Sequence, residues 1–155
     1  MNLLEQFKIP IDKKDLIPVI KQALFMSVIG GLLIGALHLL VYQAFGYSFI
    51  WMMLFILGYF MARRIKRSYQ TYHIIFAVIS IIAVFFTYYL INVVYYFGFF
   101  YVVDALQIVP IVYILNPVSY FSFLNVFNSG FFGLDNILDV VFFLIVNIYV
   151  IRYIK

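Results

Sequence analysis

All ten lysine and arginine residues of this chain lie in three short clusters that flank long apolar runs. Their positions are Lys8, Lys13, Lys14 and Lys21; Arg63, Arg64, Lys66 and Arg67; and Arg152 and Lys155. No basic residue lies between Arg67 and Arg152. Basic residues beside membrane spans are retained on the cytoplasmic side. Each cluster therefore predicts a cytoplasmic position, and Arg63, Arg64, Lys66 and Arg67 are expected to anchor the loop that follows the second span.

The composition excludes a soluble domain. The chain is 67% hydrophobic and only 10% charged, whereas about 25% of residues are charged in soluble proteins. A single membrane domain over residues 1–155 is expected, with the bilayer as its solvent. The net charge of +4 is explained by attraction of the juxtamembrane basic residues to anionic lipid, so membrane lipid is a predicted partner and nucleic acid is not.

Four helical spans are expected, at residues 23–43, 49–62, 72–97 and 136–151. The second is shorter than the roughly 20 residues that cross a bilayer, and snorkelling of Arg63 and Arg64 relieves the mismatch. The third run stays apolar to about Phe100 and would exceed the hydrocarbon core, so its helix is expected to tilt, protrude or break, with Gly98 as the break point. The first apolar run begins only near Ala23 and continues for a full span, which predicts an uncleaved anchor rather than a signal peptide.

Residues 1–22 form a cytoplasmic segment with two open interpretations. One is an amphipathic helix from Lys13, capped by Asp12, that lies on the inner leaflet. The other is a plain charged anchor ahead of the first span.

Residues 98–135 are apolar but interrupted by proline, asparagine and glycine. The uninterrupted pieces are too short to span and suit re-entrant or interfacial helices. Because this stretch has no lysine or arginine for a cytoplasmic turn, we expect it to remain outside. The predicted fold is thus an all-α polytopic membrane protein with four spans and both termini in the cytoplasm.

Small residues repeat on one face of the first predicted span. They are Ser27, Gly30, Gly31 and Gly35. Small residues let another helix approach closely, which drives helix packing in membranes. The expected use is packing against the second or third span, and the alternative is a dimer seam or a groove for a partner's helix.

Three polar residues lie inside the predicted spans: His38, Asn92 and Asn147. An ionisable residue within a membrane is a functional-site hypothesis by default. Asn92, Tyr88 and Asn147 are the predicted partners of His38, although a neutral histidine with one hydrogen bond is also compatible with a structural role.

Three acidic residues, Asp104, Asp135 and Asp139, are expected on the outer side. Asp135 is a natural N-cap for the last span, and Asp139 follows it by one turn, where the helix dipole favours negative charge. The sharper alternative is that all three, with Asn125 and Asn128, bind a cation such as calcium or magnesium or receive a basic partner.

The sequence contains no enzyme signature. It lacks HExxH, GxSxG and a glycine–lysine phosphate loop. It also lacks cysteine, which excludes disulfides, thiolate metal sites and cysteine nucleophiles. We therefore predict no catalytic residues, no metal and no cofactor.

Three segments resemble a group of small bacterial four-span membrane proteins without an assigned activity. They are the glycine-rich first span leading into Gly46–Tyr47 and Trp51, Leu57-Gly58-Tyr59 before the basic loop, and Asn116-Pro117 followed by Gly133-Leu134-Asp135. The bulky Met61-Ala62-Arg63 departs from that pattern. The resemblance implies the topology and a bacterial cytoplasmic (inner) membrane, and it implies no chemistry.

The function expected from the sequence is non-catalytic. We predict an accessory or scaffold subunit, or an immunity-type protein, that packs against another membrane protein or against its own copies. The alternative is a small oligomeric transporter or channel, since residues such as His38 and Asp139 lie in or beside spans.

Overall fold

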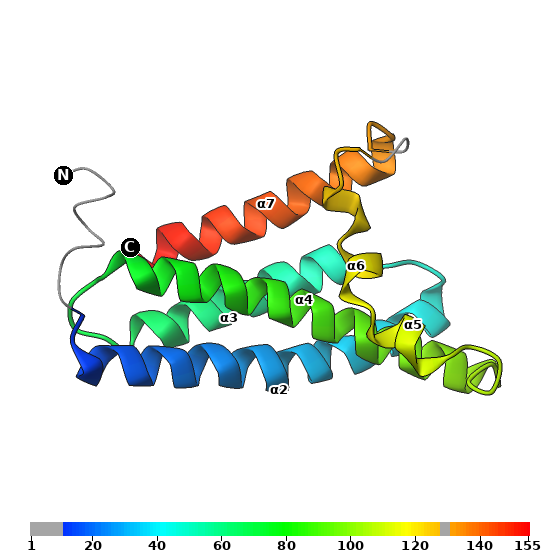
Figure 1. The fold of residues 1–155 in the computed structure, drawn as a ribbon, viewed down its shortest axis with the longest axis horizontal. Helices are drawn as coiled ribbons and strands as arrows, with labels where there is room; N and C mark the ends of the chain where they lie inside the picture. Colours follow the sequence, from blue (N-terminus) through cyan, green and yellow to red (C-terminus); the bar gives the residue numbers. More distant parts are fainter. Residues whose placement is uncertain (1–10, 128–130) are drawn as a thin grey trace.

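The computed structural model describes residues 11–127 and 131–155, and every regular element within them is a helix. The all-α prediction is confirmed. The long helices are α2 (Lys13–Phe45), α3 (Ile50–Lys66), α4 (Ile74–Val102) and α7 (Leu134–Ile154) (Figure 1). Between α4 and α7 lie the short helices α5 (Ile111–Leu115), α6 (Pro117–Tyr120) and η1 (Ser122–Leu124).

Three of the described helices are long and apolar enough to cross a membrane: α2, α4 and residues 136–154 of α7. By their length and composition, these three helices support the prediction of membrane-helix character. Helix α3 has 17 residues, fewer than the roughly 20 that usually span the hydrocarbon core. A fourth span therefore remains a prediction.

Helix α2 is continuous from Lys13, so residues 13–22 do not form a separate helix ahead of the first predicted span. Asp12 caps the helix by accepting a hydrogen bond from the Lys14 amide at 2.9 Å. Pro18 lies near the start of α2 and does not interrupt it. Gly46 ends α2 in the left-handed conformation (φ 72°), and its amide donates to the Tyr42 carbonyl at 2.8 Å.

Helix α4 also differs from the prediction, because it passes through Gly98 and ends at Val102. A Cβ atom at Gly98 would lie 2.4 Å from Cδ2 of Leu39 on α2. The missing side chain thus makes room for a helix–helix contact, and the surrounding apolar residues keep the helix intact. The expectation that this glycine breaks the helix was wrong for that reason.

The N-cap of α7 is Gly133, not Asp135 as predicted. Helix α7 therefore begins before Asp135, whose side chain lies outside the described part of the structure. Residues 1–10 and 128–130, which include Lys8 and Asn128, lie outside it too.

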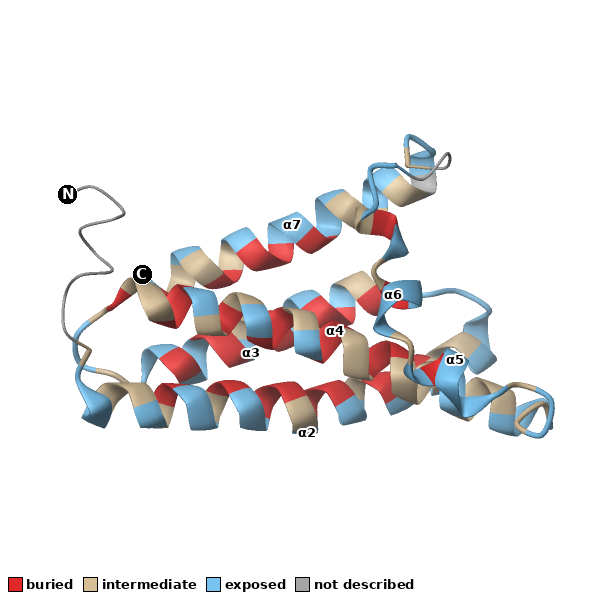
Figure 2. Cartoon of the chain, viewed as in Figure 1, coloured by how far each residue is buried: buried red, intermediate tan, exposed pale blue. Residues whose placement is uncertain are grey.

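The four long helices run roughly side by side (Figure 1). Helix α2 packs most extensively on α4, and α3 on α7. Buried residues face the bundle interior, while exposed ones face outward (Figure 2). One end of the bundle holds the start of α2, the end of α3, the start of α4 and the C-terminus; we call it the basic end, and the opposite end the far end.

The segment between α4 and α7 crosses the far end of the bundle (Figure 1). Asn116 caps α6 by accepting from the Val118 amide at 3.0 Å. Phe123, which follows in η1, is buried against Tyr88 of α4 and Phe143 of α7, with ring centroids 5.6 and 5.5 Å away. Asn136 donates to the Phe123 carbonyl at 3.0 Å. The segment thus fills the space between α4 and α7 at this end.

Candidate functional site

A cavity of about 470 Å³ lies at the far end of the bundle, between α2, α3, α4 and α7. Its lining combines polar and aromatic side chains: His38, Ser48, Ile50, Trp51, Tyr88, Asn92, Tyr95, Tyr96, Leu138, Asp139 and Phe142. Ser48 is exposed and Asp139 is partly exposed, so the cavity reaches the surface. We call it the far-end cavity. It brings together His38, Asn92 and Asp139, three residues that the sequence places far apart.

His38 lies on the last two turns of α2 and is buried. Its Nε2 atom is 3.0 Å from the Ser48 Oγ, because the Gly46 turn reverses the chain and returns Ser48 to the end of α2. The ring also stacks on Tyr95 of α4, with centroids 4.5 Å apart. Its Nδ1 atom is buried and has no hydrogen-bond partner among the described residues. The sequence predicted Tyr88, Asn92 or Asn147 as partners; the first two share the cavity, but the direct partner is Ser48.

Trp51 and Asp139 connect α3 to α7 across the cavity. The Trp51 Nε1–H donates to the Asp139 Oδ1 at 2.7 Å. The indole also stacks on Tyr88 of α4, with ring centroids 5.4 Å apart and planes inclined by 13°. One residue of α3 therefore holds a carboxylate from α7 and an aromatic ring from α4 in fixed positions.

The two intramembrane asparagines have separate surroundings. The Asn92 Nδ2 donates to the Tyr88 carbonyl on its own helix at 2.9 Å, and its side chain lines the far-end cavity. The Asn147 Nδ2 donates to the Phe143 carbonyl at 2.8 Å, while its Oδ1 is buried without a partner among the described residues. Asn147 does not line the far-end cavity.

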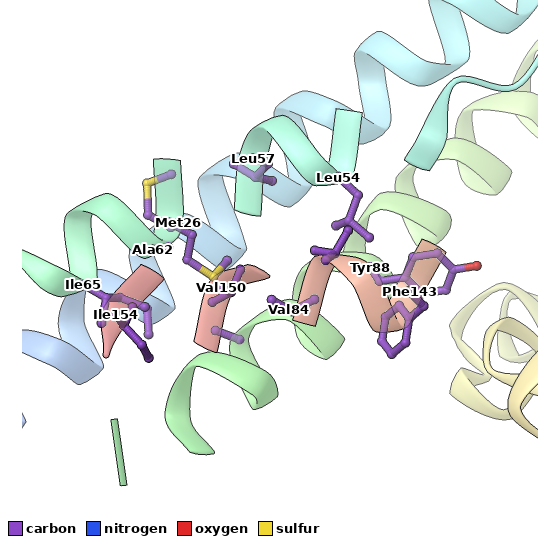
Figure 3. Close-up of a cluster of buried hydrophobic side chains, with 14 of the residues drawn as sticks. Met26, Leu54, Leu57, Ala62, Ile65, Val84, Tyr88, Phe143, Val150 and Ile154 are labelled. Atoms are coloured by element: carbon purple, nitrogen blue, oxygen red, sulfur yellow. The ribbon is translucent and has the colours of Figure 1, made fainter. Parts of the chain in front are cut away.

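The interior between the far-end cavity and the basic end is apolar (Figure 3). Its fully buried side chains include Leu54, Met61, Ile65, Val84, Val150 and Ile154. Ser80 and Thr87 are also buried, but each donates to a carbonyl of its own helix at 2.7 Å. Ser27 and Asn147 are buried as well, and they donate to the Ala83 and Phe143 carbonyls. These four polar side chains are thus bonded to helix carbonyls within a mainly apolar interior.

The contact between Ser48 and His38 resembles half of a nucleophile–base arrangement. Catalysis would require a third group that holds the histidine tautomer through Nδ1. Nδ1 has no partner among the described residues, and the carboxylate of Asp139 accepts from Trp51 instead. The pair is better explained as a hydrogen bond that fixes the turn between α2 and α3.

Of the three acidic candidates, Asp104 and Asp139 are not brought together. Asp104 is exposed in the turn after α4, with φ 54°, and it does not line the cavity that contains Asp139. The side chain of Asp135 is not described. Within the described residues, no group of three histidine or acidic side chains is placed to hold a metal ion.

The predicted small-residue face lies inside the bundle. A Cβ atom at Gly31 would lie 2.9 Å from the Leu90 Cβ, and one at Gly35 would lie 2.9 Å from the Ile91 carbonyl oxygen. Gly30 instead faces Leu57 of α3, which a Cβ would approach to 2.5 Å. The Ser27 Oγ donates to the Ala83 carbonyl of α4 at 3.0 Å. This small-residue face therefore packs against α4 and α3 of the same chain.

The four predicted anchors lie at the basic end. Arg64 donates to the Gln22 Oε1 at 3.4 Å and lies over the Phe25 ring, and Lys66 donates to the Tyr153 carbonyl at 3.0 Å. Arg63 is exposed on α3. Arg67 lines a second cavity, of about 540 Å³, between the start of α2 and the loop before α4.

A hydrogen bond from Tyr69 connects the loop before α4 to the end of α7. Its hydroxyl donates to the Ile154 carbonyl. Burial, together with the nearby Tyr72, raises the pKa of Tyr69 to about 12. The hydroxyl therefore stays protonated at neutral pH and remains a donor.

Sequence reasoning missed Ser48, Trp51, Tyr88 and Tyr95 as members of one site. Tyr88 was named only as a possible partner of His38, and Trp51 only within a resemblance. The available signal was the Gly46 turn, which places Ser48 near His38. Pairing of α3 with α7, which brings Trp51 to Asp139, has no local sequence signal. Comparison with protein-family models, with curated proteins and with solved structures finds no match to this chain.

Proposed function

We propose that the protein is a non-catalytic integral protein of a bacterial cytoplasmic membrane that acts as an accessory or scaffold subunit, in which we include an immunity-type role. All four long helices cross the bilayer, with both termini and the basic end in the cytoplasm. The far end, with its cavity and the segment between α4 and α7, is outside and is the surface that a partner contacts.

The distribution of charge supports this topology. The described basic residues lie towards the basic end, on the first turns of α2, the last turn of α3, the loop after it and the end of α7. Asp104 and Asp139 lie towards the far end. Helix α3 is about 26 Å long at 1.5 Å per residue, and Arg63, Arg64 and Lys66 in its last turn can reach the headgroups.

The topology can be tested by single-cysteine labelling, because the chain has no native cysteine. Gln70→Cys and Ser119→Cys place a thiol at exposed positions in the loop before α4 and in α6. In intact cells, a membrane-impermeant maleimide should label the cysteine at position 119 and not the one at 70. After permeabilisation both should react. Equal labelling of both in intact cells would refute the four-span topology.

The observation that carries the partner-binding role is the exposed apolar surface between α4 and α7. These residues belong to helices of three to five residues and their connections, which are too short to span. Even so, they expose large apolar side chains: Ile108, Val112, Tyr113, Val118, Val126 and Phe127. An apolar patch outside the spans is typical of an interaction surface.

Partner binding predicts that this surface controls co-purification. We expect purification in mild detergent from the native host to yield one stoichiometric membrane protein. The double substitution Ile108→Ala and Tyr113→Ala should reduce the amount of co-purified partner at least ten-fold. The matched control, Leu33→Ala and Leu40→Ala, truncates two exposed residues of α2 and should retain it. Equal recovery with both pairs, or no stoichiometric partner at all, would contradict the role.

The apolar interior argues against the transporter or channel alternative for a single chain. A conducting path needs polar or hydrated lining along its length. Leu54 and Val84, which are 1% exposed, belong instead to the packed apolar interior and do not line the far-end cavity. A cavity that is closed on one side favours binding over passage.

A further inference from the structure

We propose that α2 and α3 bind one anionic phospholipid at the basic end, with its phosphate beside Arg64 (Figure 1). We call this site the α2–α3 edge, formed by Lys21, Phe25 and Ile29 of α2 and by Ile56, Phe60 and Arg64 of α3. The inference goes beyond the accessory role, which rests on the opposite end of the bundle. It requires that both helices lie in a bilayer, and it does not depend on which leaflet faces the basic end.

The first observation is the position of Arg64 near the end of α3. Its Nη1 donates to the Gln22 Oε1 at 3.4 Å, and its guanidinium carbon lies 5.3 Å from the centroid of the Phe25 ring. Both partners belong to α2, so the side chain is oriented by the neighbouring helix even though it is exposed. A group that is already oriented loses less conformational freedom when it binds a ligand.

The second observation is that the charge of Arg64 is not neutralised within the described part of the chain. Its polar and ring contacts there are the two just given, and neither partner is an anion. The nearby carboxylates of Asp12 and Asp15 accept from the backbone amides of Lys14 and Thr71 instead. A guanidinium has five N–H donors, so Arg64 retains donors for a phosphate, which arginine binds through two parallel hydrogen bonds.

Lys21 adds a second positive charge to the α2–α3 edge. It is exposed and lies four residues before Phe25, so the two side chains are neighbours on the surface of α2. The ring that contacts Arg64 is therefore flanked by a lysine on its basic-end side. Two cations favour a headgroup with a net negative charge over a zwitterionic one, whose own ammonium they repel.

The third observation is the apolar surface that continues from these cations towards the far end. On α3, Phe60 and Ile56 follow Arg64 at intervals of four residues, and on α2 Ile29 follows Phe25 at the same interval. Residues four apart lie on one helix face, and all four apolar side chains are exposed. A cation followed by apolar surface along the helix axis matches a phospholipid, whose phosphate lies at the interface and whose acyl chains lie in the hydrocarbon core. A soluble phosphate would use only the cation.

The net charge of the lipid provides the first test. The full-length protein in mild detergent is titrated with dioleoyl phosphatidylglycerol or dioleoyl phosphatidylcholine, and native mass spectrometry counts the bound lipids. Both lipids have the same acyl chains and a phosphate, but only the first has a net negative charge. We expect the first phosphatidylglycerol to bind about ten-fold more tightly than phosphatidylcholine, because two cations attract it. Equal affinities would overturn the proposal.

Inorganic phosphate distinguishes a lipid site from a site for the anion alone. An excess of phosphate over lipid, at constant ionic strength, should leave the bound phosphatidylglycerol in place, because the acyl chains contribute to binding. Displacement by phosphate would overturn the assignment to a lipid.

Two matched substitutions separate a defined site from diffuse attraction. Arg64→Gln should weaken phosphatidylglycerol binding about ten-fold, the usual effect of losing a hydrogen bond to a charged group. Arg152→Gln removes the same charge at the same end, from an exposed position on α7, and should leave the affinity unchanged. Equal weakening in both variants would show that only the total charge matters and would refute the site.

A substitution that keeps the charge tests the orientation of Arg64. Phe25→Leu removes the ring but retains an apolar side chain, and it should weaken phosphatidylglycerol binding about two- to five-fold, the contribution of an exposed cation–π contact. Phe45→Leu, at the exposed far end of α2, is the control and should have no effect. Circular dichroism checks that each variant retains its helices. Unaltered affinity in folded Phe25→Leu would refute the proposed role of α2.

These measurements are independent of the tests of the proposed function. Lipid binding is counted on the purified protein, whereas cysteine labelling reports orientation in cells and co-purification reports a partner at the far end. Failure of the lipid site is therefore distinguishable from failure of the topology or of the accessory role.

Discussion

Replacement of Gly35 by leucine is expected to disrupt the contact between α2 and α4 and to lower the free energy of unfolding by about 3 kcal/mol, at the upper end of the usual cost of overpacking. A Cβ atom at this position would lie 2.7 Å from the Val94 Cβ and 2.9 Å from the Ile91 carbonyl oxygen. The second neighbour is backbone and cannot rotate away. The two helices must therefore move apart along their interface.

The control is the adjacent residue. Ala36 is exposed on α2, so Ala36→Leu introduces the same side chain towards lipid and should change stability by no more than about 0.5 kcal/mol. Unfolding of both variants in mixed micelles, followed by circular dichroism, gives the comparison. If Gly35→Leu were as stable as Ala36→Leu, the packing of α2 on α4 described here would be incorrect.

Replacement of Phe143 by alanine is expected to lower the free energy of unfolding by about 2–3 kcal/mol. In water-soluble cores such a change costs about 3–5 kcal/mol, through transfer and cavity formation. In lipid the transfer contribution is smaller because the surroundings are also apolar. The loss of packing contacts still lowers the stability. Phe143 is 2% exposed, and its ring lies within 4.7 Å of Phe85 and 5.5 Å of Phe123, measured between centroids.

The substitution should also loosen the segment between α4 and α7, because Phe123 loses a principal contact on α7. Trp51, whose ring centroid is 6.3 Å from that of Phe143, should report this as a shift in its emission. Leu144→Ala is the control, since Leu144 is about half exposed. A small loss of stability for Phe143→Ala, equal to that of Leu144→Ala, would show that the aromatic cluster contributes little to the fold.

Helix existence could be predicted from the sequence, but helix ends could not in every case. Apolar runs long enough for a bilayer identify α2, α4 and α7, because backbone polar groups in lipid must be satisfied within a helix. The wrong predictions of helix ends concerned residue types that can have more than one structural role. Gly98 was interpreted as a break, yet it fits against Leu39. Asp135 was interpreted as a cap, yet Gly133 has that position.

The candidate site was visible in the sequence only as separate residues. His38, Asn92 and Asp139 each stood out because a polar side chain among apolar ones requires an explanation. Their convergence on one cavity depends on which helices are neighbours, and apolar runs carry little information about that. The hydrogen bond from Trp51 to Asp139 joins residues 88 positions apart, and no local pattern predicts it.

The sequence by itself indicated the class of the protein, since so few charged residues and such long apolar runs are typical of helices in a membrane. Its basic clusters also predict an orientation, because charge position acts locally and without tertiary contacts. Only the tertiary structure decided that α4 packs against Gly31 and Gly35, and that His38, Trp51 and Asp139 line one cavity. The physical reason is that side-chain packing and directed hydrogen bonds, which select helix neighbours, depend on atomic fit in space and leave no periodic signal along the chain.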